Sequence, residues 1–289
     1  MKRILALGSV VILFGAAYLV NLPATPIPPG EAAAVKLFKS LTAEQKKKAL
    51  LAYDAKEKYK EAFPAVTRPG LPFTELTEEQ KQLVNEAISA VTSEYGAERI
   101  LKLAKQTNAS KRYLNFFGDP TKDKQFAWRM AQHHLTLIHA EFGKGKANEF
   151  GPILLGGNPA KTLWDEEDDL FRKLYASLSD EEKTTVGKNA KGKKGIVIGN
   201  LSPKAKMLAH ELLKKRAAVF ADNYRQVLEN QIKNNGGIDG LQLWVKGKDM
   251  SKSHHQGGRY DWAISGKTFL CNWQTRGNEH IHMTLRAKS

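Results

Sequence analysis

Apolar residues recur at helical spacing through much of the N-terminal half of the chain. Residues 42–63 show this spacing behind a Thr with Gln three positions later, a pair that forms a capping box. A second capping box, Thr77 with Gln80, starts another helix, and Gly96 is expected to separate that helix from the next. The stripe that this second helix would bury consists of Leu83, Val84, Ala87, Ile88 and Val91.

Helical patterns return after the middle of the chain. Residues 162–183 predict a helix followed by a second N-cap at Ser179, with Glu182 at the third helical position. Residues 202–237 predict one long helix or two. A proline at 203 suits the first turn, and two glycines at the end of this segment stop it.

Apolar and polar residues alternate, as in strands, in two separate regions. Residues 113–142 predict a hairpin or meander with its turn at 118–124, and the chain from 240 to 286 contains four short alternating runs. Residues 151–160 predict a loop, because they hold three glycines and two prolines. The order helices, strands, helices, strands predicts an α+β fold, in which both strand regions form one antiparallel sheet packed with several helices.

The first thirty residues have a different character. Lys2 and Arg3 precede an apolar run at 4–20, the pattern of an export signal or a membrane anchor. We therefore assign residues 1–24 to a signal peptide or N-terminal membrane anchor and 25–30 to a proline-rich extended spacer. Residues 31–289 are then a single α+β domain. The expected location is periplasmic or extracellular, or attached to the membrane by residues 4–20.

The charge balance is strongly basic. The formal net charge is +15, and only two of those charges lie in the N-terminal segment. Such a charge favours binding to a polyanion or to an anionic membrane surface, and the lysine-rich residues 183–195 contribute to the positive charge. Predicted export argues against a nucleic acid partner. The single cysteine, Cys271, excludes an internal disulfide and is expected to be an inert, packed thiol.

Candidate chemistry lies at the C-terminal H-x-H. Residues two apart in a strand point the same way, so His280 and His282 would share one face. The opposite, core face would carry the apolar trio Ile281, Met283 and Leu285. The two imidazoles would start roughly 7 Å apart and could reach one ion.

A second histidine pair lies in an earlier predicted strand. In the run 133–142 the apolar face takes His133, and His134 belongs to the more polar face. If the two strands are neighbours, His134, His280 and His282 form a three-histidine site with an open position. Such a site suits zinc or copper, and also nickel or iron. Candidate catalytic or orienting residues around it are Arg129, His133, Glu141 and Glu279.

The other histidines have plainer explanations. His254 and His255 lie in a polar loop and are expected to be solvated, whereas His139 and His210 are expected to lie at the surface or to be hydrogen-bonded. The glycine- and lysine-rich residues 187–195 lack the Ser or Thr that follows the lysine of a P-loop, so they predict a solvated loop.

Three motifs are specific enough to compare with a known family: W-R-x-x-x-H-H at 128–134, G-x-N-P-A at 156–160 and H-x-H at 280–282. Together with the stretches between them, they resemble a bacterial family, the domain-of-unknown-function family 3500, over residues 68–286. The resemblance implies an exported protein with no settled activity and a shared histidine site, and it makes Gly156 and Asn158 a candidate binding loop. The matching motif positions are Trp128, Arg129, His133, His134, Asn158, His280 and His282.

The chain departs from the family pattern at two places. The family usually carries an acidic residue and an Asp-Asn-Thr run in the penultimate strand, where this chain has CNWQTRG. It also tends to continue after H-x-H with W-R-D and a glycine-rich tail, where this chain has TLRAKS. If the missing acid were a ligand or general base, this chain would keep the fold without the activity.

Two hypotheses for function follow. The first is an exported metalloprotein, a metal-dependent hydrolase or oxidoreductase that uses the three histidines. The second is a non-enzymatic envelope module that binds a polyanion or a partner protein through its basic surface. Metal content of the purified body, set against the salt dependence of polyanion binding, distinguishes them.

Overall fold

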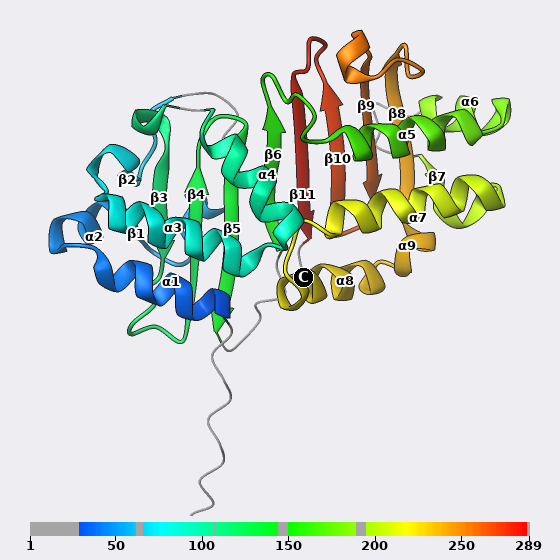
Figure 1. Ribbon diagram of the computed structural model, residues 1–289. Coiled ribbons are helices and arrows are strands. Elements are labelled where there is room, and N and C mark those ends of the chain that lie inside the picture. The colour runs from blue at the N-terminus through cyan, green and yellow to red at the C-terminus, as the bar shows by residue number, and fades with distance from the viewer. Residues whose placement is uncertain (1–28, 62–65, 107, 144–149, 189–194, 288–289) are drawn as a thin grey trace, which may run out of the picture.

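A single twisted sheet forms the frame of the molecule, which is described by a computed structural model (Figure 1). The structure describes residues 29–61, 66–106, 108–143, 150–188 and 195–287. Within these residues the strand order is β1-β3-β4-β5-β6-β11-β10-β9-β8-β7, with β2 paired to β3. The strands are β1 Leu50–Leu51, β2 Leu71–Pro72, β3 Tyr113–Phe117, β4 Gln125–Ala131, β5 Leu135–Gly143, β6 Phe150–Gly157, β7 Ile196–Val197, β8 Gln242–Lys248, β9 Arg259–Ser265, β10 Phe269–Thr275 and β11 Ile281–Ala287.

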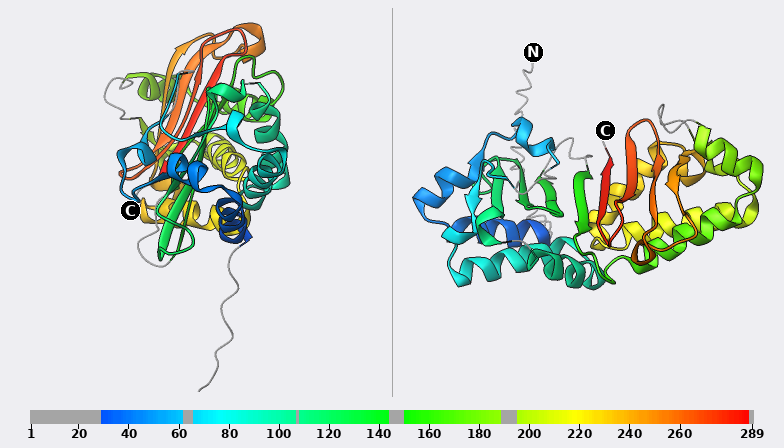
Figure 2. Two further views of the ribbon diagram at one scale, coloured as in Figure 1. Left: turned by 90° about the vertical axis from the view of Figure 1, so that its left-hand side faces the viewer. Right: turned by 90° about the horizontal axis from the view of Figure 1, so that it is seen from above.

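Most of the helical layer covers one face of this sheet (Figures 1 and 2). Helices α1, α3 and α4 cover the half that contains β3–β5, and α5, α7 and α8 cover the other half. The α-helices are α1 Pro29–Ser40, α2 Ala43–Ala49, α3 Glu78–Val91, α4 Glu94–Ala104, α5 Asp165–Ser177, α6 Asp180–Lys188, α7 Pro203–Ala217, α8 Asp222–Asn234 and α9 Gly237–Gly240. Short 3-10 turns are η1 Lys56–Tyr59, η2 Phe73–Glu75, η3 Ala109–Lys111, η4 Ile198–Asn200 and η5 His254–Gln256.

The α+β prediction is confirmed. Both strand regions join one sheet, and its pairs are antiparallel except for the two-residue β1, which runs parallel to β3. The core lies between the sheet and the helices. There Phe171 of α5 stacks on Trp262 with ring centroids 5.7 Å apart, and Trp262 stacks on Trp273 at 6.2 Å. Full burial of one such ring stabilises the fold by roughly 1.5–3 kcal/mol.

Both predicted capping boxes are present. Thr42 accepts a hydrogen bond from the Gln45 backbone, and Thr77 accepts one from Gln80, with the reciprocal glutamine bonds in place. The stripe on α3 is buried as predicted. The Ser179 cap also forms, and residues 202–237 contain two long helices, α7 and α8, followed by the short α9.

Two helix boundaries were predicted wrongly. The helix expected over 42–63 ends at Ala49, because the next two residues pair with β3 instead. The break expected at Gly96 lies earlier: α3 ends at Val91, and Ser93 caps α4 by accepting the Gly96 N–H. Gly96 has a packing role, since a Cβ there would lie 1.9 Å from the Val219 carbonyl oxygen.

The loop expected over 151–160 is also wrong. Residues 150–157 form β6, a fully buried central strand that joins the two predicted strand regions. The proline is accommodated because β6 pairs with β5 only through Leu154 and Leu155, so the Pro152 position needs no ladder bond to β5. A glycine- and proline-rich stretch can therefore have the composition of a turn and still form a central strand of the sheet.

The N-terminal assignments stay predictions. The signal or anchor segment 1–24 lies outside the described residues, as does most of the 25–30 spacer. Helix α1 begins at Pro29, so the last two spacer residues are helical and the folded body starts two positions before Glu31. Among the residues that the structure describes, none of the helices is both long and apolar enough to span a bilayer.

Candidate metal centre

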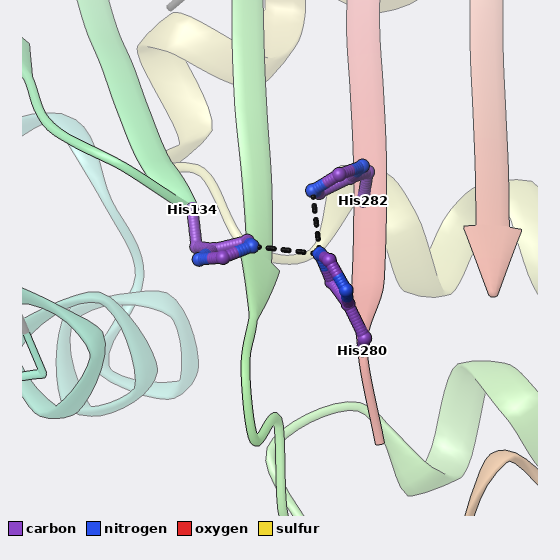
Figure 3. Close-up of side chains that lie close together, drawn as sticks. All are labelled: His134, His280 and His282. Atoms are coloured by element: carbon purple, nitrogen blue, oxygen red, sulfur yellow. Dashed lines mark hydrogen bonds between the residues drawn. The ribbon is translucent and has the colours of Figure 1, made fainter. Parts of the chain in front are cut away.

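Three imidazoles from two distant segments converge on one point (Figure 3). The Nε2 atom of His134 lies 2.9 Å from that of His280, which lies 3.1 Å from Nε2 of His282. All three ligand atoms lie within 4.8 Å of one another. The cluster predicted from the sequence is therefore assembled by the fold.

The strands explain how these side chains meet. In β11, Ile281, Met283 and Leu285 are buried in the core, so His282 projects from the opposite face, and His280 directly precedes the strand. His134 directly precedes β5 in a left-handed conformation with φ 62°. Its position was predicted to be within a strand, whereas it is the last residue of the turn between β4 and β5.

Gly156 separates the two sides of the cluster. It pairs with His282 across β6 and β11, and the Leu135–Leu155 pair places His134 on its other side. Because Gly156 has no side chain, no β6 side chain fills the space between the two imidazoles on the neighbouring strands. Gly156 is thus a buried strand residue and not part of a loop, while Asn158 is exposed two positions later. A direct binding role for either residue stays a prediction.

The histidines are held in the neutral form that metal ligation needs. Burial, with neighbouring histidines as a smaller cause, lowers the pKa of His134 to about 3 and that of His282 to about 4. Burial also lowers the pKa of His280. The cluster therefore presents lone pairs and no repelling positive charge at neutral pH.

A cation satisfies this arrangement better than hydrogen bonds do. Each Nε2 carries either one proton or one lone pair in the ring plane, so His280 can complete a linear N–H···N bond with only one of its two neighbours. A tetrahedral zinc ion with Zn–N bonds of roughly 2.0–2.1 Å places its ligand nitrogens roughly 3.3 Å apart, close to the spacing seen here. Three imidazoles leave a fourth position open.

Of the four candidate catalytic residues, His133 lies nearest to the cluster. Its ring centroid is 3.5 Å from that of His134, and its pKa is lowered, mainly by burial. Half-buried beside the three ligands, it is placed to orient His134 or a bound molecule. Glu279 directly precedes His280, but its carboxylate binds His255.

Arg129 and Glu141 have other partners. Arg129 donates to the Asn115 side chain at 2.7 and 3.1 Å and to the Glu57 carbonyl, which fixes the segment around η1 against β3 and β4. Glu141 forms a buried ion pair with Lys58 at 2.8 Å. These contacts stabilise the scaffold, and the structure does not bring either side chain into the histidine cluster.

A second polar cluster was missed in the sequence. His254 and His255 were expected to be solvated, but His254 is fully buried, and the Nε2 atoms of both reach Oδ1 of Asp165, at 2.9 and 2.8 Å. The consecutive histidines were a visible signal. Their partner lies about ninety positions earlier, at the start of α5, and no spacing rule links the two.

The remaining histidines and the cysteine fit their structural explanations. His139 is buried and its Nδ1 donates to the Gly151 carbonyl at 3.0 Å, while His210 pairs with Asp239 at 2.6 Å. Cys271 is fully buried and in no disulfide, and burial raises its pKa to about 11, as expected of an inert thiol.

Comparison with known families now places the chain. Residues 24–289 match the model of a family described as protein of unknown function, DUF3500. The chain belongs to the DUF3500 family. The match confirms the resemblance and extends it beyond 68–286 in both directions. No match was found among curated proteins or solved structures. The DUF3500 assignment names no activity.

Proposed function

We propose that this DUF3500 protein is a metalloprotein whose resident ion is held by His134, His280 and His282. The observation that carries the proposal is the convergence of three Nε2 atoms, with 2.9 and 3.1 Å between neighbours, from segments that are 146 positions apart. Their lowered pKa values support it, because neutral imidazoles bind metal without first losing a proton.

Zinc or copper suits this donor set best. Catalytic zinc is held by three protein ligands, which can all be histidines, and keeps a fourth position open. Imidazole also binds copper well. With no carboxylate among the ligands, the bound ion keeps its full charge and acidifies a water in the open position. The reaction class that follows is metal-dependent hydrolysis with zinc, or oxidation with copper. In either class His133 is placed to contact a bound molecule.

Metal content and ligand variants test the proposal. Untagged protein should contain one ion that depends on the three histidines, and His134→Ala, His280→Ala and His282→Ala should each lose it. His210→Ala is the matched control, because His210 pairs with a single carboxylate outside the cluster and its loss should leave the content unchanged. Full metal in the His282→Ala protein would refute the site.

We further propose, from the sequence of residues 1–24, that the chain is exported. A basic start followed by an apolar run supports this location, and +15 net charge is compatible with it. Mass spectrometry of the protein from its native host tests it. A chain that begins after residue 17 or 24 is expected for cleavage, and an intact chain in the membrane fraction for anchoring. An intact chain in the cytoplasmic fraction would contradict export.

A further inference from the structure

We infer that Asp165, His254 and His255 form a second divalent-cation site, separate from the three-histidine centre. The ligand atoms would be Oδ1 of Asp165 and Nε2 of each histidine. Two neutral imidazoles and one carboxylate suit zinc, and also the iron of two-histidine, one-carboxylate centres.

Convergence is the first observation behind this site. His254 and His255 are consecutive, yet both rings turn toward one carboxylate oxygen, with their centroids 3.9 Å apart. The three ligand atoms lie within 4.8 Å of one another. His254 is fully buried, so its ring is held by packing, while His255 and Asp165 are partly exposed and leave a route for an ion.

The groups around these ligands hold them in place for a metal. Nδ1 of His255 lies 2.7 Å from Oε1 of Glu279. With an ion bound, Nδ1 would donate to this carboxylate and the Nε2 lone pair would point at the ion, in place of the contact that Nε2 makes with Asp165 at 2.8 Å. Such a carboxylate bond to the far nitrogen is the usual partner of a metal-binding histidine. The backbone N–H of His254 donates to Oδ2 of Asp168 at 3.3 Å, and the Tyr260 hydroxyl donates to the other oxygen of Asp168. Asp165 follows Trp164, whose indole N–H binds the Gly156 carbonyl at 2.9 Å.

Charge also favours a cation at this point. Carboxylates of Asp165 and Glu279 contact the two imidazoles, in a protein whose net charge is +15. Asp168 also lies beside His254, but its charge is shared with Arg172 at 3.4 Å. This acidic spot lies where the β8–β9 connection and the β10–β11 turn meet the start of α5, at one end of the sheet (Figure 1). Glu279, which contacts His255, immediately precedes His280 of the three-histidine centre, so the two clusters are close in the chain.

Zinc stoichiometry tests the second site separately from the first. The apo full-length chain, dialysed against zinc, should bind two equivalents. Asp165→Asn and His255→Gln should each bind one, His282→Ala should bind one, and the double variant Asp165→Asn/His282→Ala none. Asp239→Asn is the matched control, since Asp239 pairs with His210 in an exposed His–Asp contact that lacks a third ligand, and it should still bind two.

The outcomes separate the two proposals. One equivalent in the wild type, lost in His282→Ala and kept in both Asp165→Asn and His255→Gln, overturns the second site and leaves the first. One equivalent with the opposite dependence overturns the three-histidine centre alone. His255→Gln replaces a partly exposed side chain and is expected to fold, so it tests the second site even if Asp165→Asn fails to fold. Glu279→Gln, made in the His282→Ala background, should keep the remaining equivalent but weaken it by roughly 10- to 100-fold.

Discussion

His134 and His282 face each other across Gly156, which contributes no side chain between them. The strand order β5-β6-β11 is what makes this possible, because it places one residue of β6 between the two histidine positions. The geometry of the candidate centre therefore depends on a position that cannot itself bind a metal through a side chain.

Gly156→Ala should disrupt the centre without removing a ligand. A Cβ at this position would lie 2.2 Å from the Ile281 carbonyl oxygen, so β6 and β11 must separate. We expect a loss of metal from the three-histidine centre and a decrease of about 1–3 kcal/mol in the free energy of unfolding. Metal analysis and chemical denaturation measure the two effects.

Gly187→Ala is the control for that substitution. A Cβ at Gly187 meets no atom within 4 Å, and its φ is not positive, so neither metal content nor stability should decrease. Unchanged metal content in Gly156→Ala would show that the spacing of β6 and β11 does not set the histidine geometry.

Lys58→Met should destabilise the protein without affecting the metal. Lys58 and Glu141 are both almost fully buried and 2.8 Å apart, so removing the Lys58 ammonium takes away a full positive charge from a buried carboxylate. The expected decrease in the free energy of unfolding is about 3–5 kcal/mol. The double variant Lys58→Met/Glu141→Gln should recover much of it. Loss of metal in a folded Glu141→Gln protein would instead place Glu141 in the site.

His139 should make the apo protein less stable in mild acid. It is fully buried between Lys58, Arg129 and Glu141, and burial, with the charge of Lys58 next, lowers its pKa to about 3 from an ordinary 6.5. The unfolded chain then binds the extra proton between about pH 6.5 and 3, so stability decreases as pH falls through that window. The slope from this one group is about 1.4 kcal/mol per pH unit.

His139→Asn isolates that slope. The Asn amide can still donate toward the Gly151 carbonyl, but it takes up no proton. With metal chelated, denaturation at pH 7 and pH 5.5 should show a smaller acid-induced loss for the variant than for the wild type. Equal losses would mean that His139 is protonated in the folded state.

Local patterns predicted much of this fold. Capping boxes depend on side chains three positions apart, so the helix starts at Thr42 and Thr77 could be predicted directly from the sequence. The H-x-H faces followed from strand periodicity. Patterns failed where a distant partner decides the conformation: Leu50 leaves a good helical sequence to pair with Phe116, and the glycines of β6 lie in a strand because β11 pairs with them.

The same contrast between local patterns and distant partners applies to the candidate site. His134, His280 and His282 were predicted as one cluster because each lies in or directly beside a strand that the sequence pattern indicates. The cluster of Asp165, His254 and His255 was missed, because Asp165 opens a helix and the two histidines lie in a 3-10 turn. Only the packing of α5 against the β8–β9 connection brings them together.

The single domain predicted for the body should unfold in one cooperative step. The junction of β5 and β6 has only two paired positions in register, which would be a weak link on its own. Two contacts beside it join the halves: Ser93 N–H donates to the Val219 carbonyl at 3.0 Å, and Ala221 N–H donates to the Val91 carbonyl at 3.1 Å. The calorimetric and van't Hoff enthalpies of thermal unfolding should therefore agree.

Gly96→Ala probes that connection directly, because its Cβ would collide with the same Val219 carbonyl. If the halves unfold together, the substitution should lower the midpoint of the whole transition and keep it single, at a cost of about 1–3 kcal/mol. If they are separate domains, the variant should resolve two transitions in calorimetry. A single transition in both the wild type and Gly96→Ala would establish that the two halves of the sheet share one folding unit.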